Sequence, residues 1–104
     1  MQALQGIKNK MTSAIWKYNL CIGQTRIDMP KGATIRMAQM QHERLTLWVQ
    51  VNPDEKETEE RWFRTYTTGS EFVVKDADGG KAEYITTIQL DNGDYVFHLF
   101  EIIK

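Results

Sequence analysis

Apolar and polar residues alternate with a period of two along much of this chain, which is typical of strands with one buried face. In the stretch 44–52, every second position is a branched aliphatic residue: Leu45, Leu47, Val49 and Val51. We expect these four side chains to face a core. Trp48 belongs to the alternate set and is expected to face outward.

Several other stretches are rich in aromatic and β-branched residues, which fit a pleated surface. Extended segments are expected at residues 15–22, 24–29, 33–41, 44–52, 61–67, 71–75, 83–90 and 95–104. Among these eight extended segments we expect about seven strands, and we expect no long helix. The acidic stretch 52–60 is expected to be a loop. The pattern predicts an all-β fold, either a small antiparallel sandwich or a partly open barrel.

Turn residues separate these stretches. Asn92–Gly93 suits a two-residue type I′ turn, because both central positions need a positive φ, and it predicts a C-terminal hairpin. The closing strand 95–104 is apolar on both faces, so we expect it to be central in a sheet or buried against a partner. His42 and Glu43 are expected at another hairpin tip.

The length of 104 residues predicts one domain with one core. We expect a single β domain over residues 15–104 and a flexible N-terminal lead-in over residues 1–14, whose sequence is polar. No apolar run reaches the length of a membrane helix. The one cysteine, Cys21, excludes an internal disulfide and is expected to be a small buried hydrophobe.

Charge is unevenly spread along the chain, although the net charge is only −1. Residues 1–50 hold seven Lys/Arg against two Asp/Glu, a net charge of +5, and residues 51–104 hold six against twelve, a net charge of −6. Paired strands from the two halves would interleave these charges. The alternative is a two-faced surface that favours head-to-tail association or a polar partner.

The sequence carries no recognisable catalytic or metal motif. Two histidines and one cysteine are too few for a structural zinc site. Asp76 and Asp78 resemble the start of a calcium loop, but the required glycine and glutamate are missing from their positions. His98 lies within the apolar closing strand and is expected to be a core or interface residue with satisfied nitrogens. We expect no buried polar cluster with which the protein could carry out a reaction, no cofactor, no metal and no enzymatic activity.

Aromatic and arginine side chains provide the candidate binding surface. Trp, Tyr and Arg are enriched in the hot spots of protein interfaces, and the candidates are Trp48, Trp62, Arg64, Tyr66 and Trp16. If strand 61–67 pairs nearby, its Trp62, Arg64 and Tyr66 extend the outward face of Trp48. The alternative is that a second layer, the N-terminal segment or a closed barrel covers these side chains. A pocket lined by Trp16, Trp62 and Tyr66 would instead bind a small ligand.

Nucleic acid is a further alternative, because single-strand binders stack bases on aromatic side chains interleaved with cations. The stretches 16–18 and 62–66 have that composition. The pI of about 6.1 and the lack of a concentrated basic patch argue against this alternative.

Short blocks distributed along the chain resemble a family of short proteins of unknown function encoded by bacteriophages and bacteria. The blocks are Ile15–Tyr18, Met29–Ala33, Leu47–Trp48, Val51–Pro53, Arg61, Phe63–Arg64, Thr68–Gly69, Glu83–Thr87 and Phe97–Glu101. The resemblance covers residues 15–101. Family members often have Gly-Thr-Gly where this chain has Thr67–Gly69, and glycine where it has Thr86. The resemblance implies a phage or prophage origin and a cytoplasmic setting, and it supplies no catalytic residues.

The sequence therefore predicts a non-enzymatic protein-interaction module of phage type that acts in the cytoplasm of a bacterial host. The most specific version of this prediction is an inhibitor of a host system. The expected partner is a protein, and self-association into a homodimer would also cover the closing strand. No membrane partner is expected.

Overall fold

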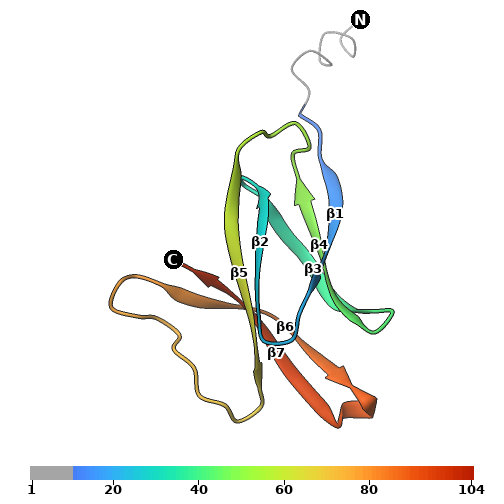
Figure 1. Ribbon diagram of the computed structural model, residues 1–104, viewed down its shortest axis with the longest axis vertical. Coiled ribbons are helices and arrows are strands. Elements are labelled where there is room, and N and C mark those ends of the chain that lie inside the picture. Colours follow the sequence, from blue (N-terminus) through green and yellow to red (C-terminus); the bar gives the residue numbers. More distant parts are fainter. Residues whose placement is uncertain (1–10) are drawn as a thin grey trace, which may run out of the picture.

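Two antiparallel sheets form the protein in a computed structural model, which describes residues 11–104 (Figure 1). One sheet has the strand order β1-β4-β3 and the other has the order β2-β5-β7-β6. The strands are β1 Ala14–Leu20, β2 Gln24–Pro30, β3 Thr34–Gln41, β4 Arg44–Val51, β5 Thr58–Thr67, β6 Lys81–Leu90 and β7 Tyr95–Ile103. The sheets stay separate and do not close into a barrel, so the predicted all-β fold is confirmed in its sandwich form.

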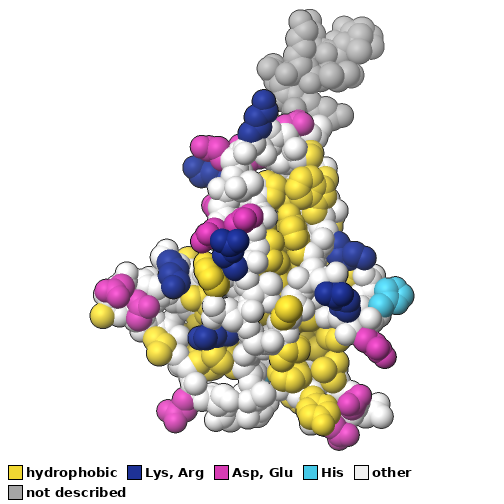
Figure 2. All heavy atoms as spheres, viewed as in Figure 1, with side chains coloured by type: hydrophobic (Ala, Val, Ile, Leu, Met, Phe, Trp, Pro, Cys, Tyr) yellow, Lys and Arg dark blue, Asp and Glu magenta, His cyan; other side chains and the backbone are white. Residues whose placement is uncertain are grey.

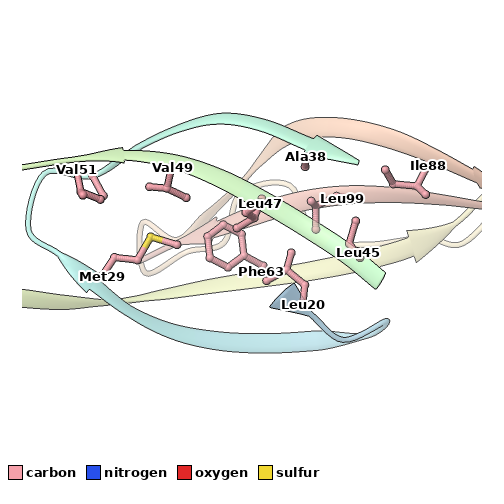
Figure 3. Packing of buried hydrophobic residues seen from close by; sticks show 11 residues of the cluster. Leu20, Met29, Ala38, Leu45, Leu47, Val49, Val51, Phe63, Ile88 and Leu99 are labelled. Atoms are coloured by element: carbon pink, nitrogen blue, oxygen red, sulfur yellow. The ribbon is translucent and has the colours of Figure 1, made fainter. Parts of the chain in front are cut away.

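The core lies between the two sheets and is built mainly from alternate residues of β4. Leu45, Leu47, Val49 and Val51 are at most 2% exposed, as the alternation predicts. Figure 3 shows the Leu47 and Phe63 side chains meeting between β4 and β5. Because β4 is the central strand of its sheet, its inward side chains are covered on both flanks as well as from above.

The closing strand β7 lies between β5 and β6, the central position expected for it. On its outer face, Phe100 packs against Phe72 from the connection between β5 and β6. Leu99 on its inner side is 1% exposed and joins the core with Ile88 from β6. The connection between β6 and β7 contains Asn92 and Gly93 at φ of 57° and 93°, as a type I′ turn requires. Asp91 also adopts a positive φ, of 49°, so four residues separate the last ladder pair, Leu90 and Tyr95.

Three details of the predicted strands are wrong. The stretch 71–75 forms no strand and makes one isolated bridge, between Lys75 and Lys81. Strand β5 begins at Thr58, three residues inside the predicted acidic loop. Strand β1 ends at Leu20, which leaves Cys21 in an exposed turn rather than buried. The predicted lead-in falls mostly on residues 1–10, outside the described residues, and Ala14 already belongs to β1.

The β3–β4 hairpin turns through His42 and Glu43, at the predicted tip. Gln41 pairs with Arg44, so His42 and Glu43 form the whole loop. Both have positive φ, 49° and 66°, which is the region that glycine and asparagine tolerate best. The loop therefore has the backbone of a type I′ turn without the residues that usually occupy it.

Candidate functional site

The outer face of the β2-β5-β7-β6 sheet gathers five aromatic side chains around one arginine. Side chains alternate along a strand, so Trp62, Arg64 and Tyr66 of β5 point away from the core, while Phe63 points into it with 1% exposure. The pairing register places Phe100 of β7 beside Arg64 and Tyr84 of β6 beside Phe100. We call the set Trp62, Arg64, Tyr66, Phe72, Tyr84 and Phe100 the aromatic face.

Four of these rings pack against one another, those of Tyr66, Phe72, Tyr84 and Phe100. Phe72, from the connection between β5 and β6, stacks on Tyr66 at a centroid distance of 4.3 Å, and it lies 4.7 Å from Phe100. The Tyr84 ring meets Phe100 edge-on at 5.6 Å. The guanidinium carbon of Arg64 lies 5.9 Å from the Tyr66 centroid, within the range of a cation–π interaction. The cluster is thus ordered by its own contacts.

Much of the aromatic face is accessible. Tyr84 is 60% exposed, Arg64 is exposed, and Trp62, Tyr66 and Phe100 are partly buried. The connection over residues 68–80 covers one part of the face and encloses a hollow of about 330 Å³ against the sheet. Arg64, Tyr66, Phe72 and Ile102 line this hollow. Within residues 11–104, the cover over these residues is therefore limited to this one connection.

A chain of hydrogen bonds crosses the same face. The two ring nitrogens of His98 are 2.8 Å from the Thr68 hydroxyl and 3.0 Å from the Thr87 hydroxyl. The Thr87 hydroxyl also lies 2.7 Å from the Tyr84 hydroxyl. The expectation that both His98 nitrogens are satisfied is confirmed. The hydrogen bonds also fix Tyr84 at the edge of the aromatic face.

The structure separates the other two sequence candidates from this face. Trp48 lies on the outer face of the β1-β4-β3 sheet, so the expectation that β5 extends its face is wrong. Trp16 pairs with inward-facing Val49 and lies at the open edge of the sandwich, 40% exposed. Figure 2 shows the band of hydrophobic side chains along this edge, between β1 and β2. Trp16, Trp62 and Tyr66 consequently do not line one pocket.

Sequence reasoning missed a buried ion pair. The Arg61 guanidinium binds the Glu101 carboxylate through Nε–Oε2 and through Nη2–Oε1 at 2.9 Å. Its Nη1 donates to the Ala33 carbonyl at 2.8 Å and to Glu59 at 3.4 Å. The side chains of Arg61 and Glu101 are 16% and 10% exposed. The core of the described residues therefore contains a buried polar cluster that the sequence analysis did not predict.

This ion pair lies in a cleft of about 600 Å³ between the edge strands β3 and β6. Both strands have a register shift at the cleft, between Ile35 and Met37 and between Tyr84 and Thr86. Hydrogen bonds to the Glu101 carboxylate raise the pKa of the Arg61 guanidinium above its usual value. Most of the Arg61 donors already have partners, so the pair ties β5, β7 and the β2–β3 turn together rather than offering a free charge.

Residues 11–104 contain no cluster of three His, Cys, Asp or Glu side chains that could hold a metal ion. Asp76 instead closes a turn, since its Oδ1 accepts the Asp78 and Gly80 amides at 2.9 and 2.8 Å. A Cβ atom at position 80 would lie 2.8 Å from the Asp76 carboxylate. In this same part of the chain, no helix has the length and apolarity needed to cross a membrane.

Comparison with known proteins finds one relationship. Residues 11–104 match the family described as Domain of unknown function (DUF7352). No curated protein and no solved structure matches the chain. The match covers all seven strands and both sheets, from β1 to the end of β7. The chain therefore belongs to this family of domains of unknown function.

Proposed function

We propose that this protein is a non-enzymatic protein-interaction module of phage or prophage origin, and that it docks a protein partner on the aromatic face. The observation that carries the proposal is the accessible group of Trp62, Arg64, Tyr66 and Tyr84 on one sheet face. Trp, Tyr and Arg are enriched among the residues that dominate the binding energy of protein interfaces. Trp and Tyr bury large areas with only two side-chain torsions.

The aromatic face is organised before a partner arrives. Phe72 and Phe100 support Tyr66, and the Thr87 hydroxyl holds Tyr84. A side chain already fixed in the free protein loses less conformational entropy on binding. This order favours a rigid surface that blocks whatever it covers, and occlusion of a host or phage macromolecule is the proposed mechanism.

The phage origin and the setting in the bacterial cytoplasm rest on the sequence resemblance described above. Inhibition of a host system fits a small preformed surface of this kind. A homodimer that buries the aromatic face is the alternative use of the same residues. Light scattering distinguishes the two, because a dimer through this face would dissociate when Tyr84 is replaced by alanine.

The proposal is tested in two steps. The tagged protein first captures its partner from phage-infected cells, and the affinity of each variant for the purified partner is then measured. The test variant is R64A/Y84A, and the matched control on the other sheet is R36A/M37A, which also removes one exposed arginine and one exposed apolar side chain. We expect the control to bind the purified partner normally. We expect R64A/Y84A to weaken binding about 30-fold, the effect of losing a hot spot. Equal affinities for both variants would refute docking on this face.

A small ligand is the second candidate, favoured by the hollow of about 330 Å³ beneath the 68–80 connection. Such a volume lies in the range of small-molecule sites. Its wall carries both cations and carboxylates, so a polar ligand could pair with either, while Tyr66 and Phe72 would pack against the apolar part of the ligand. Native mass spectrometry of the purified protein would show a bound metabolite that F72A no longer retains.

A further inference from the structure

The charged residues of the β1-β4-β3 sheet are all basic. Its three strands contain Lys17, Arg36 and Arg44 and no Asp or Glu. The strands of the other sheet hold five acidic residues, Asp28, Glu59, Glu60, Glu83 and Glu101, with four basic ones. The low pI of the whole chain thus conceals a segregation of charge between the sheets.

All three cations occupy the outer face of their sheet. Arg44 belongs to the half of β4 that alternates with the buried Leu45 and Leu47. Lys17 is the register partner of Trp48, which belongs to the same outward half. Arg36 lies at the register shift in β3 and donates to the outward-facing Gln50. We call Lys17, Arg36, Arg44 and Trp48 the basic face.

The charges of the basic face are not neutralised. Within residues 11–104, none of the three cations forms an ion pair with a carboxylate. The Lys17 ammonium donates to Gln41 Oε1 at 2.9 Å, crossing β4 to reach β3, and Arg36 Nε donates to Gln50 Oε1 at 2.8 Å. Neutral amides therefore hold two of the cations in position and leave their charge available to an anion.

Trp48 lies in the middle of the basic face. It is half-buried and forms a cross-strand row with Lys17 on one side and Met37 on the other. Amide side chains, which can both donate and accept hydrogen bonds, surround the row: Asn19, Gln39, Gln41 and Gln50. Cations for phosphates, an indole for stacking and amides for base edges are the groups that single-strand binders combine.

We propose that the basic face binds single-stranded nucleic acid, with phosphates at Lys17, Arg36 and Arg44 and one base stacked on Trp48. The sheet is about 10 Å across from β1 to β3, two strand spacings, which suits one backbone rather than a duplex. A base must also leave a helical stack to reach Trp48. The stretches singled out in the sequence differ from this site, because Trp16 and Tyr18 point to the opposite side of β1 from Lys17.

Fluorescence anisotropy with a labelled oligo-dT of about 15 nucleotides tests the proposal. We expect binding at low salt whose affinity falls with rising salt, with a log–log slope near −2 for three phosphate contacts. The double substitution R36Q/R44Q is expected to weaken binding at least tenfold and to reduce the slope to about −0.7. K75Q/K81Q, which removes two exposed lysines that belong to neither the basic face nor the aromatic face, is the matched control and is expected to bind as the unmodified chain does.

Trp48 is tested through its aromatic character, so that loss of structure is not mistaken for loss of stacking. Trp48→Leu is expected to weaken binding about tenfold with an unchanged salt slope, whereas Trp48→Phe keeps most of the affinity. Circular dichroism confirms that both variants fold. Absence of binding at low salt would overturn the proposal, as would weakening by K75Q/K81Q in place of R36Q/R44Q. Tighter binding of a 15-base-pair duplex, or equally tight binding of polyglutamate, would also overturn the proposal, because the basic face would then prefer another polyanion or would not distinguish between polyanions.

Discussion

The ion pair between Arg61 and Glu101 is the most consequential polar contact in the described core. Each charge is mostly removed from water, and each has the other as its main partner. Such pairs contribute little net stability when intact, because desolvation offsets the attraction. Removing one partner leaves an uncompensated buried charge.

Arg61→Ala is therefore expected to lower the free energy of unfolding by about 3 kcal/mol. The double variant R61M/E101L removes both charges and keeps apolar volume, so it should recover most of that loss. Urea denaturation of the single and double variants measures the difference. A double variant as unstable as Arg61→Ala would mean that the bond from Arg61 to the Ala33 carbonyl matters more than the pair.

Tyr18 provides a pH-dependent contribution at the edge of the core. Its hydroxyl is partly buried, and burial raises its pKa above the usual 10.0 because the phenolate is poorly solvated there. The folded state therefore holds this proton more tightly than the unfolded state. The resulting stability is fully present below about pH 10 and is lost as the pH rises through the raised pKa.

We expect the free energy of unfolding to fall more steeply above pH 10 in the unmodified chain than in Tyr18→Phe. Urea denaturation between pH 8 and pH 11 provides both curves. Lysine titration affects the two proteins equally, so their difference isolates the tyrosine. Parallel curves would show that Tyr18 ionises as freely in the folded chain as in the unfolded one.

Among the elements, the β3–β4 turn is the one whose sequence fits its backbone least well. His42 and Glu43 both adopt the left-handed region, which costs a residue with a Cβ about 1 kcal/mol relative to glycine. Glu43→Gly should stabilise the protein by about 0.5 kcal/mol after the greater chain entropy of glycine is counted. Thermal unfolding measures it, and Gln39→Gly in the neighbouring strand, where φ is extended, should destabilise instead.

Most elements could be predicted from the sequence because alternation and turn residues act locally. The inward set of β4 and the Asn92–Gly93 turn are examples. The strand prediction for residues 71–75 was wrong. Phe72 and Val73 are residue types common in strands, but in the structure Phe72 stacks on Tyr66. Its role depends on a contact with β5 and β7 that local pattern does not encode.

The candidate sites were predictable only in part for the same reason. Trp62, Arg64 and Tyr66 share a face through simple alternation, so their grouping follows from β5 alone. Their neighbours Tyr84 and Phe100 depend on which strands pair. One feature of the sequence did indicate the ion pair. Glu101 is the only acidic residue in β7, and by alternation it lies on the same face as the inward-facing Leu99.

At the scale of the whole molecule, one hydrophobic cluster joins residues from both sheets, including Leu47 of β4, Phe63 of β5 and Leu99 of β7. We expect the chain to unfold in a single cooperative transition, seen at the same urea concentration by circular dichroism and tryptophan fluorescence. Leu47→Ala, at a site with no solvent exposure, should lower the free energy of unfolding by about 3 kcal/mol.

The exposed Gln39→Ala on the neighbouring strand is the control and should change stability by less than about 0.5 kcal/mol. Separate transitions for the two probes would indicate that the β6–β7 hairpin, which extends beyond the other strands in Figure 1, unfolds on its own.

Within residues 11–104, no backbone hydrogen-bond ladder passes from one sheet to the other, and packed side chains and chain connections join them. A molecule bound to either outer surface would then have little means of altering affinity at the opposite one. If both surfaces are used, this small protein acts as a passive bridge that holds two ligands at a fixed spacing. The fraction of protein with both ligands bound should then equal the product of the fractions bound when each ligand is measured alone.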